Sequence, residues 1–309
     1  MPGCSNSDVP SLSPRSTLAT VRHVLTGRPL RVARSVRYGP SAGQELDIWR
    51  SPGVDVTSGS APVLLFVPGG GWVHGRAAGQ GGALMGRLAS RGWVCVAVNY
   101  RVSPNHAWPT HIEDVKRALG WVHRNIGAFG GSADFVAIAG ASAGGHLATL
   151  AGLTSEGGRW QPGFDQEPVS VDAVVSLYGR YDWESRGTRE RQRFMDFLER
   201  VVVRATQAEA GDVFADASPM AQIRLNAPPM LVVHGACDAI IPVDQARQFV
   251  SRMAAVSAAP TVYAELPGAG HAFDIVDPYR AVVMSRAIEH FLDHVRAMKV
   301  EQRSRPSAS

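Results

Sequence analysis

The segment from Asp134 to Leu150, DFVAIAGASAGGHLATL, constrains the fold more than any other part of the sequence. Its first half is a short apolar run typical of a buried strand, and its second half has the composition of a helix. Between them, residues 140–144 read G-x-S-x-G with Ser142 at the centre. A sharp strand-to-helix turn lifts such a serine above the sheet edge, because the glycines leave room around it. The segment therefore predicts a strand, a tight turn and a helix. Ser142 is either a nucleophile or a residue that only caps the helix.

Strand-like and helix-like segments alternate along most of the chain. Residues 34–39 and 44–50 are expected to form a hairpin. Further apolar runs predict buried strands at 62–67, 93–100, 134–140, 171–179, 230–234 and 261–266. Helices are expected at 84–91, 112–126, 143–152, 245–256 and 278–298. Continuous apolar strands separated by helices are typical of a parallel sheet covered on both faces. The sequence therefore predicts an α/β fold with a mostly parallel central sheet.

The alternation stops between Arg180 and Asn226, where the chain is charged and helical and contains no obvious strand. Such an insert is expected on the outside of the sheet. We divide the chain into a tail with a cap helix at 1–30, partly disordered, a single domain at 31–300 and a disordered tail at 301–309. The insert at about 180–226 belongs to the single domain.

Composition and charge exclude several classes of protein. The chain has 309 residues, 45% of them hydrophobic, and a formal charge of +4 with basic and acidic residues interspersed, so we expect no nucleic-acid partner. Cys4, Cys95 and Cys237 form neither a disulfide framework nor a metal-binding pattern, which favours a reducing compartment. The sequence contains no run resembling a secretory signal or a membrane span. These features predict a cytoplasmic location and say nothing about the oligomeric state.

A catalytic serine requires a base and an acid that orients the base. His271 follows the last predicted strand in a glycine-flanked loop, and Asp238 lies in the loop after the preceding strand. The order Ser142, Asp238, His271 is the order expected for a G-x-S-x-G fold, with each residue at the carboxyl end of a parallel strand. Asp182 and Asp274 are rival acids, and we favour Asp238 because its loop faces the same sheet edge.

A glycine-rich loop follows the strand at 62–67. Gly69, Gly70 and Gly71 leave backbone amides uncovered, so an oxyanion can approach them, and Ala143 supplies the amide after the serine. A phosphate-binding loop is the competing interpretation, but the segment has neither a Gly-Lys-Ser/Thr ending nor a G-x-G-x-x-G pattern. We therefore predict an oxyanion hole formed by Gly70, Gly71 and Ala143.

With these parts in chain order, the sequence resembles the α/β-hydrolase superfamily and, within it, the bacterial hormone-sensitive-lipase-like carboxylesterases and lipases. The resemblance covers about Val36 to Met298 and rests on PGGGW (68–72), NYRVSPNHAWP (99–109), GASAGG (140–145), HGACDAIIP (234–242) and GAGHAF (268–273). Pro68 departs from the pattern, because that group has histidine there. Proline would order the loop by fixing its own φ, so we expect the oxyanion hole to survive.

The resemblance implies an α/β-hydrolase fold with a helical cap. It also implies hydrolysis of carboxylic esters through an acyl-enzyme on Ser142, with His271 as base and Asp238 as acid. No metal or cofactor would be needed. The expected substrate is a small-molecule ester or lipid, with short to medium acyl chains. Four aromatic residues are candidates to line the pocket: Trp72, Trp183, Phe194 and Phe197.

Two other functions remain open at this stage. An amidase, such as an arylformamide hydrolase of the same fold, would use the same residues on a different leaving group. A ligand-binding protein on a hydrolase scaffold would use none of them catalytically. The N-terminal segment Leu18–Leu25, with arginines around it, is expected either to close the cap or to rest on an anionic membrane surface, which would make the protein peripheral.

Overall fold

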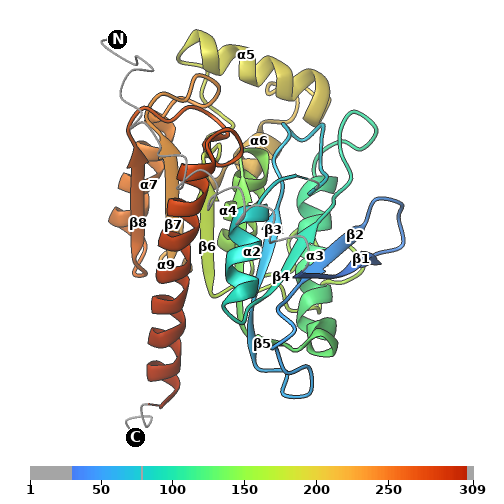
Figure 1. The fold of residues 1–309 in the computed structure, drawn as a ribbon. Helices are drawn as coiled ribbons and strands as arrows, with labels where there is room; N and C mark the ends of the chain where they lie inside the picture. The colour runs from blue at the N-terminus through green and yellow to red at the C-terminus, as the bar shows by residue number, and fades with distance from the viewer. Residues whose placement is uncertain (1–29, 78, 305–309) are drawn as a thin grey trace, which may run out of the picture.

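An eight-stranded sheet forms the centre of the molecule in the computed structural model, which describes residues 30–77 and 79–304. Its spatial order is β1-β2-β4-β3-β5-β6-β7-β8 (Figure 1). The strands are β1 (Arg31–Arg37), β2 (Glu45–Trp49), β3 (Ala61–Val67), β4 (Val94–Val98), β5 (Gly131–Ala141), β6 (Ala173–Leu177), β7 (Met230–Gly235) and β8 (Thr261–Leu266). β1 and β2 form the expected antiparallel hairpin, β2 is antiparallel to β4, and β3 to β8 are parallel. The prediction of a mostly parallel sheet is confirmed.

Helices cover both faces of this sheet. α2 (Gly82–Ser90), the short α8 (Phe273–Val276) and α9 (Pro278–Ser304) pack on one face, where their apolar side chains share a core with the strands. α3 (Thr110–Asn125), α4 (Ala143–Leu153) and α7 (Asp244–Val256) pack on the other face around a second core. η3 (Ile126–Phe129) continues α3. Both faces of the parallel strands are thus buried, which explains why their sequences are continuously apolar.

Two boundaries differ from the sequence-based expectation. β5 begins three residues before Asp134, and α9 continues to Ser304 rather than ending near Met298. The extra helical turns contain neither glycine nor proline, and Lys299 and Arg303 pair with Asp172 and Asp134. Residues 301–304 are therefore helical and do not belong to a tail. The predicted N-terminal tail, the helix at 18–25 and residues 305–309 lie outside the described residues.

The parallel register brings four loops to one edge of the sheet. Val67, the last residue of β3, pairs with Gly140 of β5, and Ala141 pairs with Leu177 at the end of β6. Gly235 of β7 pairs with Leu266 of β8. The loops after β3, β5, β7 and β8 therefore emerge together, as expected for a site built at the carboxyl ends of parallel strands.

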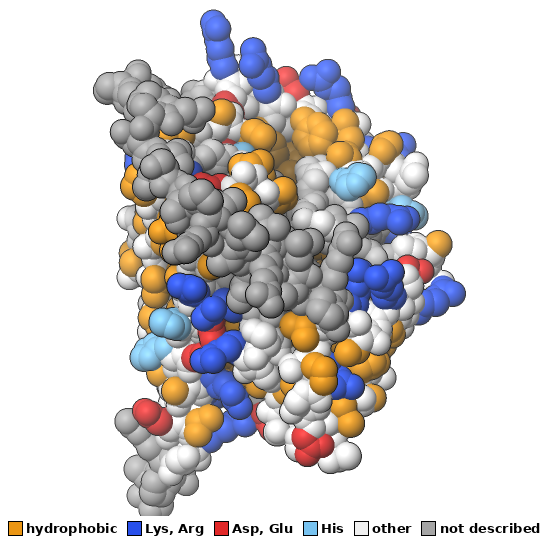
Figure 2. Space-filling model, in the orientation of Figure 1, with side chains coloured by type: hydrophobic (Ala, Val, Ile, Leu, Met, Phe, Trp, Pro, Cys, Tyr) orange, Lys and Arg blue, Asp and Glu red, His pale blue; other side chains and the backbone are white. Residues whose placement is uncertain are grey.

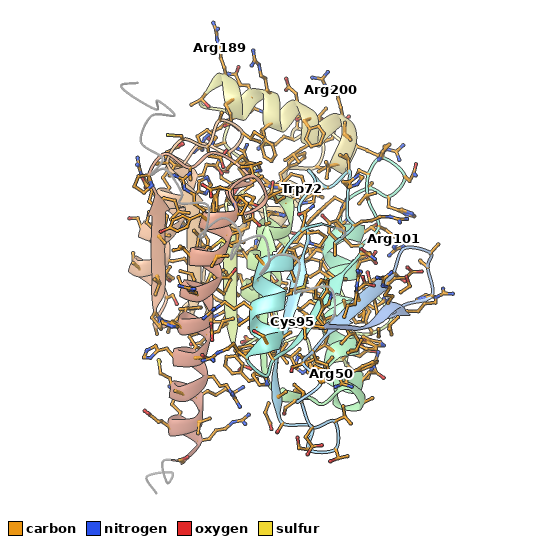
Figure 3. All side chains as sticks on the ribbon, in the orientation of Figure 1. Arg50, Trp72, Cys95, Arg101, Arg189 and Arg200 are labelled. Carbon is orange, nitrogen blue, oxygen red and sulfur yellow. The ribbon has the colours of Figure 1, made fainter. Side chains whose placement is uncertain are left out.

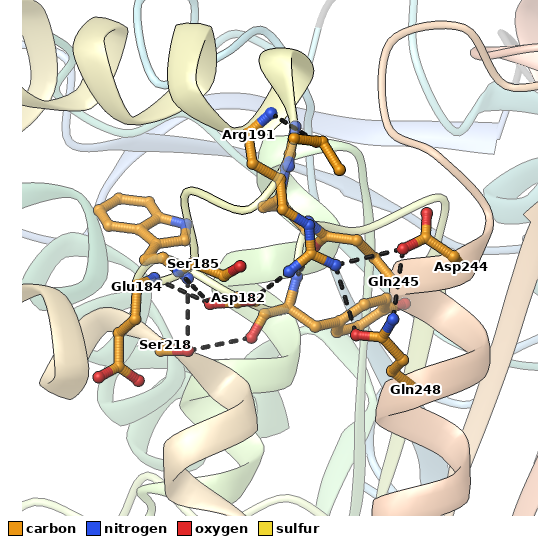
Figure 4. Close-up of polar contacts among 12 residues, drawn as sticks. Asp182, Glu184, Ser185, Arg191, Ser218, Asp244, Gln245 and Gln248 are labelled. Atoms are coloured by element: carbon orange, nitrogen blue, oxygen red, sulfur yellow. Dashed lines mark hydrogen bonds and ion pairs between the residues drawn. The ribbon is translucent and has the colours of Figure 1, made fainter.

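Residues 180–226 lie over this edge. The segment contains α5 (Arg189–Phe197), the π-helix η4 (Leu198–Val203), α6 (Gly211–Ala217) and η5 (Pro219–Gln222), and no strand, as predicted. α5 crosses the top of the molecule in Figure 1. Arg191 anchors it by pairing with Asp182 at 2.7 Å and with Asp244 of α7 at 3.2 Å, and by donating to Gln248 (Figure 4). One buried arginine thus joins the insert to the body.

Over residues 30–77 and 79–304, no helix combines the length and the apolar character that crossing a bilayer would require. Cys237 is disulfide-bonded, so the expectation that the cysteines form no disulfide framework is wrong at this position. The cysteine pattern therefore no longer argues for a reducing compartment.

Candidate active site

Ser142 occupies the turn between β5 and α4 in a strained backbone conformation. Its φ of 55° is positive, which is uncommon for a residue with a side chain. The strain is held on both sides, because its N–H donates to Leu177 O at 2.9 Å and its carbonyl accepts from the His146 N–H at 3.0 Å. The hydroxyl is fixed at the carboxyl edge of the sheet in this way.

The glycines around Ser142 are required by close backbone contacts. A Cβ on Gly140 would lie 2.1 Å from the carbonyl oxygen of Gly144, and a Cβ on Gly144 would lie 2.1 Å from that of Val67. Neither oxygen can move without displacing main chain. Only glycine fits at these two positions, which is why the turn can be recognised in the sequence.

His271 links Ser142 to Asp238. Its Nε2 lies 2.9 Å from Ser142 Oγ and its Nδ1 lies 2.7 Å from Asp238 Oδ2. The Asp238 carboxylate can only accept at Nδ1, so Nε2 of the neutral ring is free to accept the serine proton. The structure thus brings the three residues named from the sequence into one hydrogen-bonded chain.

Asp238 is kept charged by its surroundings. Its Oδ1 accepts from the N–H groups of Ile240 and Ile241, at 2.9 and 2.8 Å. Burial acts to raise the pKa of Asp238, but hydrogen bonds from His234 and His271 outweigh it and hold the pKa well below its usual range. The carboxylate is therefore ionised at neutral pH.

His234, at the end of β7, contacts both the backbone and Asp238. Its Nε2 lies 2.8 Å from Ile241 O and 3.3 Å from Asp238 Oδ2. The spacing of four residues between His234 and Asp238 across a strand end was the only sequence signal for this contact.

The two rival acids do not contact His271. Asp182 accepts from Arg191 and from the backbone of Glu184 and Ser185 in the insert. Asp274 accepts from the Tyr178 hydroxyl, whose ring packs edge-on against His271 with centroids 4.7 Å apart. Asp274 therefore acts on His271 through the Tyr178 ring and through its charge, and not through a hydrogen bond.

The loop after β3 presents free backbone donors beside Ser142. Among the described residues, the N–H groups of Gly70 and Gly71 have no hydrogen-bond partner, and both glycines have positive φ, 136° and 60°. Ala143 is the first residue of α4, where N–H groups lack partners within the helix. These three donors are available to an incoming oxyanion.

Two side chains hold this loop in place by hydrogen bonds. Gln80 accepts from the Gly69 N–H at 2.7 Å and donates to Gly69 O at 3.3 Å. The Tyr100 hydroxyl donates to Pro68 O at 3.1 Å. Tyr100 lies in the segment 99–109 on which the resemblance rests, whereas nothing in the sequence singled out Gln80.

A cavity of about 440 Å³ opens above Ser142. Trp72, Phe194 and Phe197 line it, as expected, together with residues 239–241 of the loop that carries Asp238. Hydrophobic side chains gather beside a hollow just below the basic side chains at the top of Figure 2, where α5 crosses the molecule. The cavity is large enough for a small organic substrate.

Trp183 does not line this cavity, so that part of the sequence-based prediction is wrong. Its side chain is fully buried and packs edge-on against Trp72, with ring centroids 4.9 Å apart. Its other face stacks on His146 at 4.6 Å. Burial lowers the pKa of His146 to about 3, so this ring is neutral. Trp183 supports the pocket wall from behind.

Within the described part of the chain, no group of three or more His, Cys, Asp or Glu side chains is arranged to hold a metal ion.

Comparison with known proteins identifies a matching family and several related esterases. The BD-FAE family model matches residues 46–253. Esterase LipC of Mycobacterium tuberculosis is 52% identical over 269 residues, covering 87% of this chain and 66% of that protein. The probable carboxylic ester hydrolase LipM of the same organism is 46% identical over 282 residues, covering 88% and 65%. The chain spans just under two thirds of the length of these relatives.

Among solved structures, a butyrate-bound esterase from Thermogutta terrifontis, Est2, superposes with a TM-score of 0.69. The match covers 84% of this chain and 93% of that one, at 22% sequence identity. The expected α/β-hydrolase fold is confirmed by this agreement with the sheet and helix layers described above.

Proposed function

Because the chain belongs to the BD-FAE family, and its relatives include named esterases, we propose that it hydrolyses carboxylic esters through an acyl-enzyme on Ser142. The observation that carries this proposal is the hydrogen-bonded chain from Asp238 through His271 to Ser142 at the floor of a cavity. An isolated serine is a poor nucleophile, and this arrangement supplies the base that activates it.

In the proposed mechanism, Ser142 Oγ attacks the acyl carbonyl carbon while His271 Nε2 takes the hydroxyl proton. Asp238 holds the imidazole in the required tautomer and stabilises the imidazolium. The N–H groups of Gly70, Gly71 and Ala143 stabilise the tetrahedral oxyanion. His271 then returns the proton to the leaving alcohol, and water repeats both steps on the acyl-enzyme.

The insert at 180–226 would act as the cap of the acyl pocket. A cavity of about 440 Å³ with aromatic walls supports small-molecule esters with short to medium acyl chains as substrates. The buried position of Trp72, beneath α5 in Figure 3, supports its assignment to the pocket wall.

The proposal is tested by hydrolysis of p-nitrophenyl esters with acyl chains of two to sixteen carbons. We expect Ser142→Ala to reduce kcat/KM by at least about a thousandfold, because the nucleophile is lost. Ser170→Ala is the matched control, since Ser170 is exposed and lies at the far end of the sheet. Activity that survives in Ser142→Ala, or an inert wild-type protein that no fluorophosphonate labels, would refute the proposal.

A further inference from the structure

Arg180 is a buried charged residue that lines the cavity. The proposed mechanism gives it no role. It follows β6 by three residues and lines the same cavity as Ser142. Its side chain is 3% exposed. Such burial is unusual for arginine, since a guanidinium without full pairing is costly to remove from water.

The partners of Arg180 come from α5. Its guanidinium carbon lies 3.8 Å from the centroid of the Phe194 ring, and its Nη2 pairs with Glu190 Oε1. Burial lowers the pKa of Arg180, and the Glu190 carboxylate opposes this change. The ion pair therefore joins the start of the insert, just after β6, to α5.

This ion pair leaves hydrogen-bonding capacity unused on both sides. Within the described part of the chain, Nε and Nη1 of Arg180 have no hydrogen-bond partner, although both atoms are buried. Glu190 Oε2 is likewise buried without a partner. Two donors and one acceptor are thus unsatisfied on two residues that line a cavity whose other lining residues are mostly aromatic or aliphatic, apart from Ser142 and Arg193.

Resting on the ester hydrolysis proposed above, we infer that the Arg180–Glu190 pair binds a neutral hydroxyl group on the substrate, so that the enzyme prefers hydroxyl-bearing esters. A hydroxyl can accept from one of the two unpaired Arg180 donors and donate to Glu190, so it gives each group a hydrogen-bond partner. An alkyl group satisfies neither. A carboxylate would suit Arg180 but would bring a second negative charge against Glu190.

The test measures kcat/KM by proton release for matched esters that differ in this one group. The acyl series contains methyl 3-hydroxybutanoate, methyl 3-methylbutanoate and monomethyl succinate. The alcohol series contains the butanoate esters of ethylene glycol, of 1-propanol and of glycolic acid. In at least one series we expect wild type to prefer the hydroxyl ester roughly ten- to hundredfold over the alkyl ester, as expected for a hydrogen bond to a charged group. The carboxylate ester should rank below the hydroxyl ester.

Removing the pair should abolish this preference. In Arg180→Met/Glu190→Met the ratio of hydroxyl to alkyl ester is expected to fall to about 1, while the alkyl ester is still hydrolysed, because apolar replacement of a buried ion pair is often tolerated. Arg189→Met is the matched control. Arg189 is adjacent to Glu190 but exposed, and it points away from the body in Figure 3, so the wild-type ratio should persist.

A second variant tests the charge argument directly. Glu190→Gln keeps the size of the side chain but removes its negative charge, so the carboxylate ester should gain at least about fivefold relative to the hydroxyl ester. A purely structural role for Glu190 would change all three substrates together. If the double variant does not fold, Glu190→Gln still tests the hydroxyl site.

The outcomes separate the two proposals. Equal wild-type rates on hydroxyl and alkyl esters in both series, or a preference that persists in the double variant, would overturn the hydroxyl site while ester hydrolysis stands. Failure to hydrolyse any ester would overturn ester hydrolysis and the hydroxyl site with it.

Discussion

The turn around Ser142 and the insert that covers it are held by different forces. At the turn, main-chain atoms are packed so closely that Cβ atoms on Gly140 and Gly144 would each meet a carbonyl oxygen at 2.1 Å. In residues 180–226, apolar side chains of α5, η4 and α6 join the core of the body, and charged side chains add further connections, with Arg191 joined to Asp182 and Asp244. Steric fit allows one arrangement only, whereas ion pairs can be weakened by degrees. We therefore expect changes at the turn to be nearly all-or-none and changes in the insert to be graded.

The largest expected difference in stability between the two regions comes from adding one methyl group to each. Gly144→Ala is expected to cost more than about 4 kcal/mol in the free energy of unfolding, because its Cβ would overlap the carbonyl oxygens of Val67 and Pro68. At Gly211, the first residue of α6, an added Cβ would meet no described atom within 4 Å. Gly211→Ala should therefore be neutral or stabilising by up to about 1 kcal/mol. Urea unfolding measures both values, and a similar cost for the two variants would contradict the comparison.

The next-largest changes in stability are expected when ion pairs of the insert are removed. Arg191→Met is expected to cost about 2–3 kcal/mol, because it leaves the Asp182 carboxylate largely buried without its charged partner. Arg200→Met is the control, since Arg200 is 76% exposed and its pair with Asp196 spans 3.6 Å. That variant should change stability by less than about 0.5 kcal/mol. Both values come from urea unfolding. If Arg191→Met were as mild as Arg200→Met, the anchoring role would be refuted.

Lys116 is an exception within the body, because its contribution to stability depends on pH. Among the described residues, this buried lysine on α3 donates to the carbonyl oxygens of Thr154 and Arg159 and has no carboxylate partner. Burial, with smaller contributions from Arg159 and Arg224, lowers its pKa from 10.5 to about 7. Between these values the unfolded chain binds more protons than the folded one, so stability should rise with pH.

The measurement is urea unfolding of wild type and Lys116→Met at pH 7, 8 and 9. The slope contributed by Lys116 should approach about 1.4 kcal/mol per pH unit toward pH 9, and it should be absent from the variant. Parallel pH profiles for the two proteins would show that Lys116 does not titrate in this range.

The same contrast explains what could be predicted from the sequence. The strand, turn and helix around Ser142 were predictable because the close contacts lie within a few residues and only glycine satisfies them. The loops with Asp238 and His271 were predictable because parallel strands end at one edge. By contrast, the pairing of Arg180 with Glu190 and the position of Trp183 behind Trp72 depend on how the insert folds back over the sheet. No local pattern encodes those contacts. Gln80 was missed for the same reason, since its partner Gly69 is met only after the loop closes.

The long helix α9 has a practical consequence. Glu289 on this helix pairs with Arg87 and Arg91 at α2, so the helix is fastened along the side of the sheet. Its last turns extend away from the body, and its end lies at the opposite pole of the molecule from α5 (Figure 1). A linker attached at this end would hold the protein on a solid support with the mouth of the cavity facing the solution. Immobilisation through α9 should therefore preserve access for substrates, whereas attachment through α5 should obstruct it.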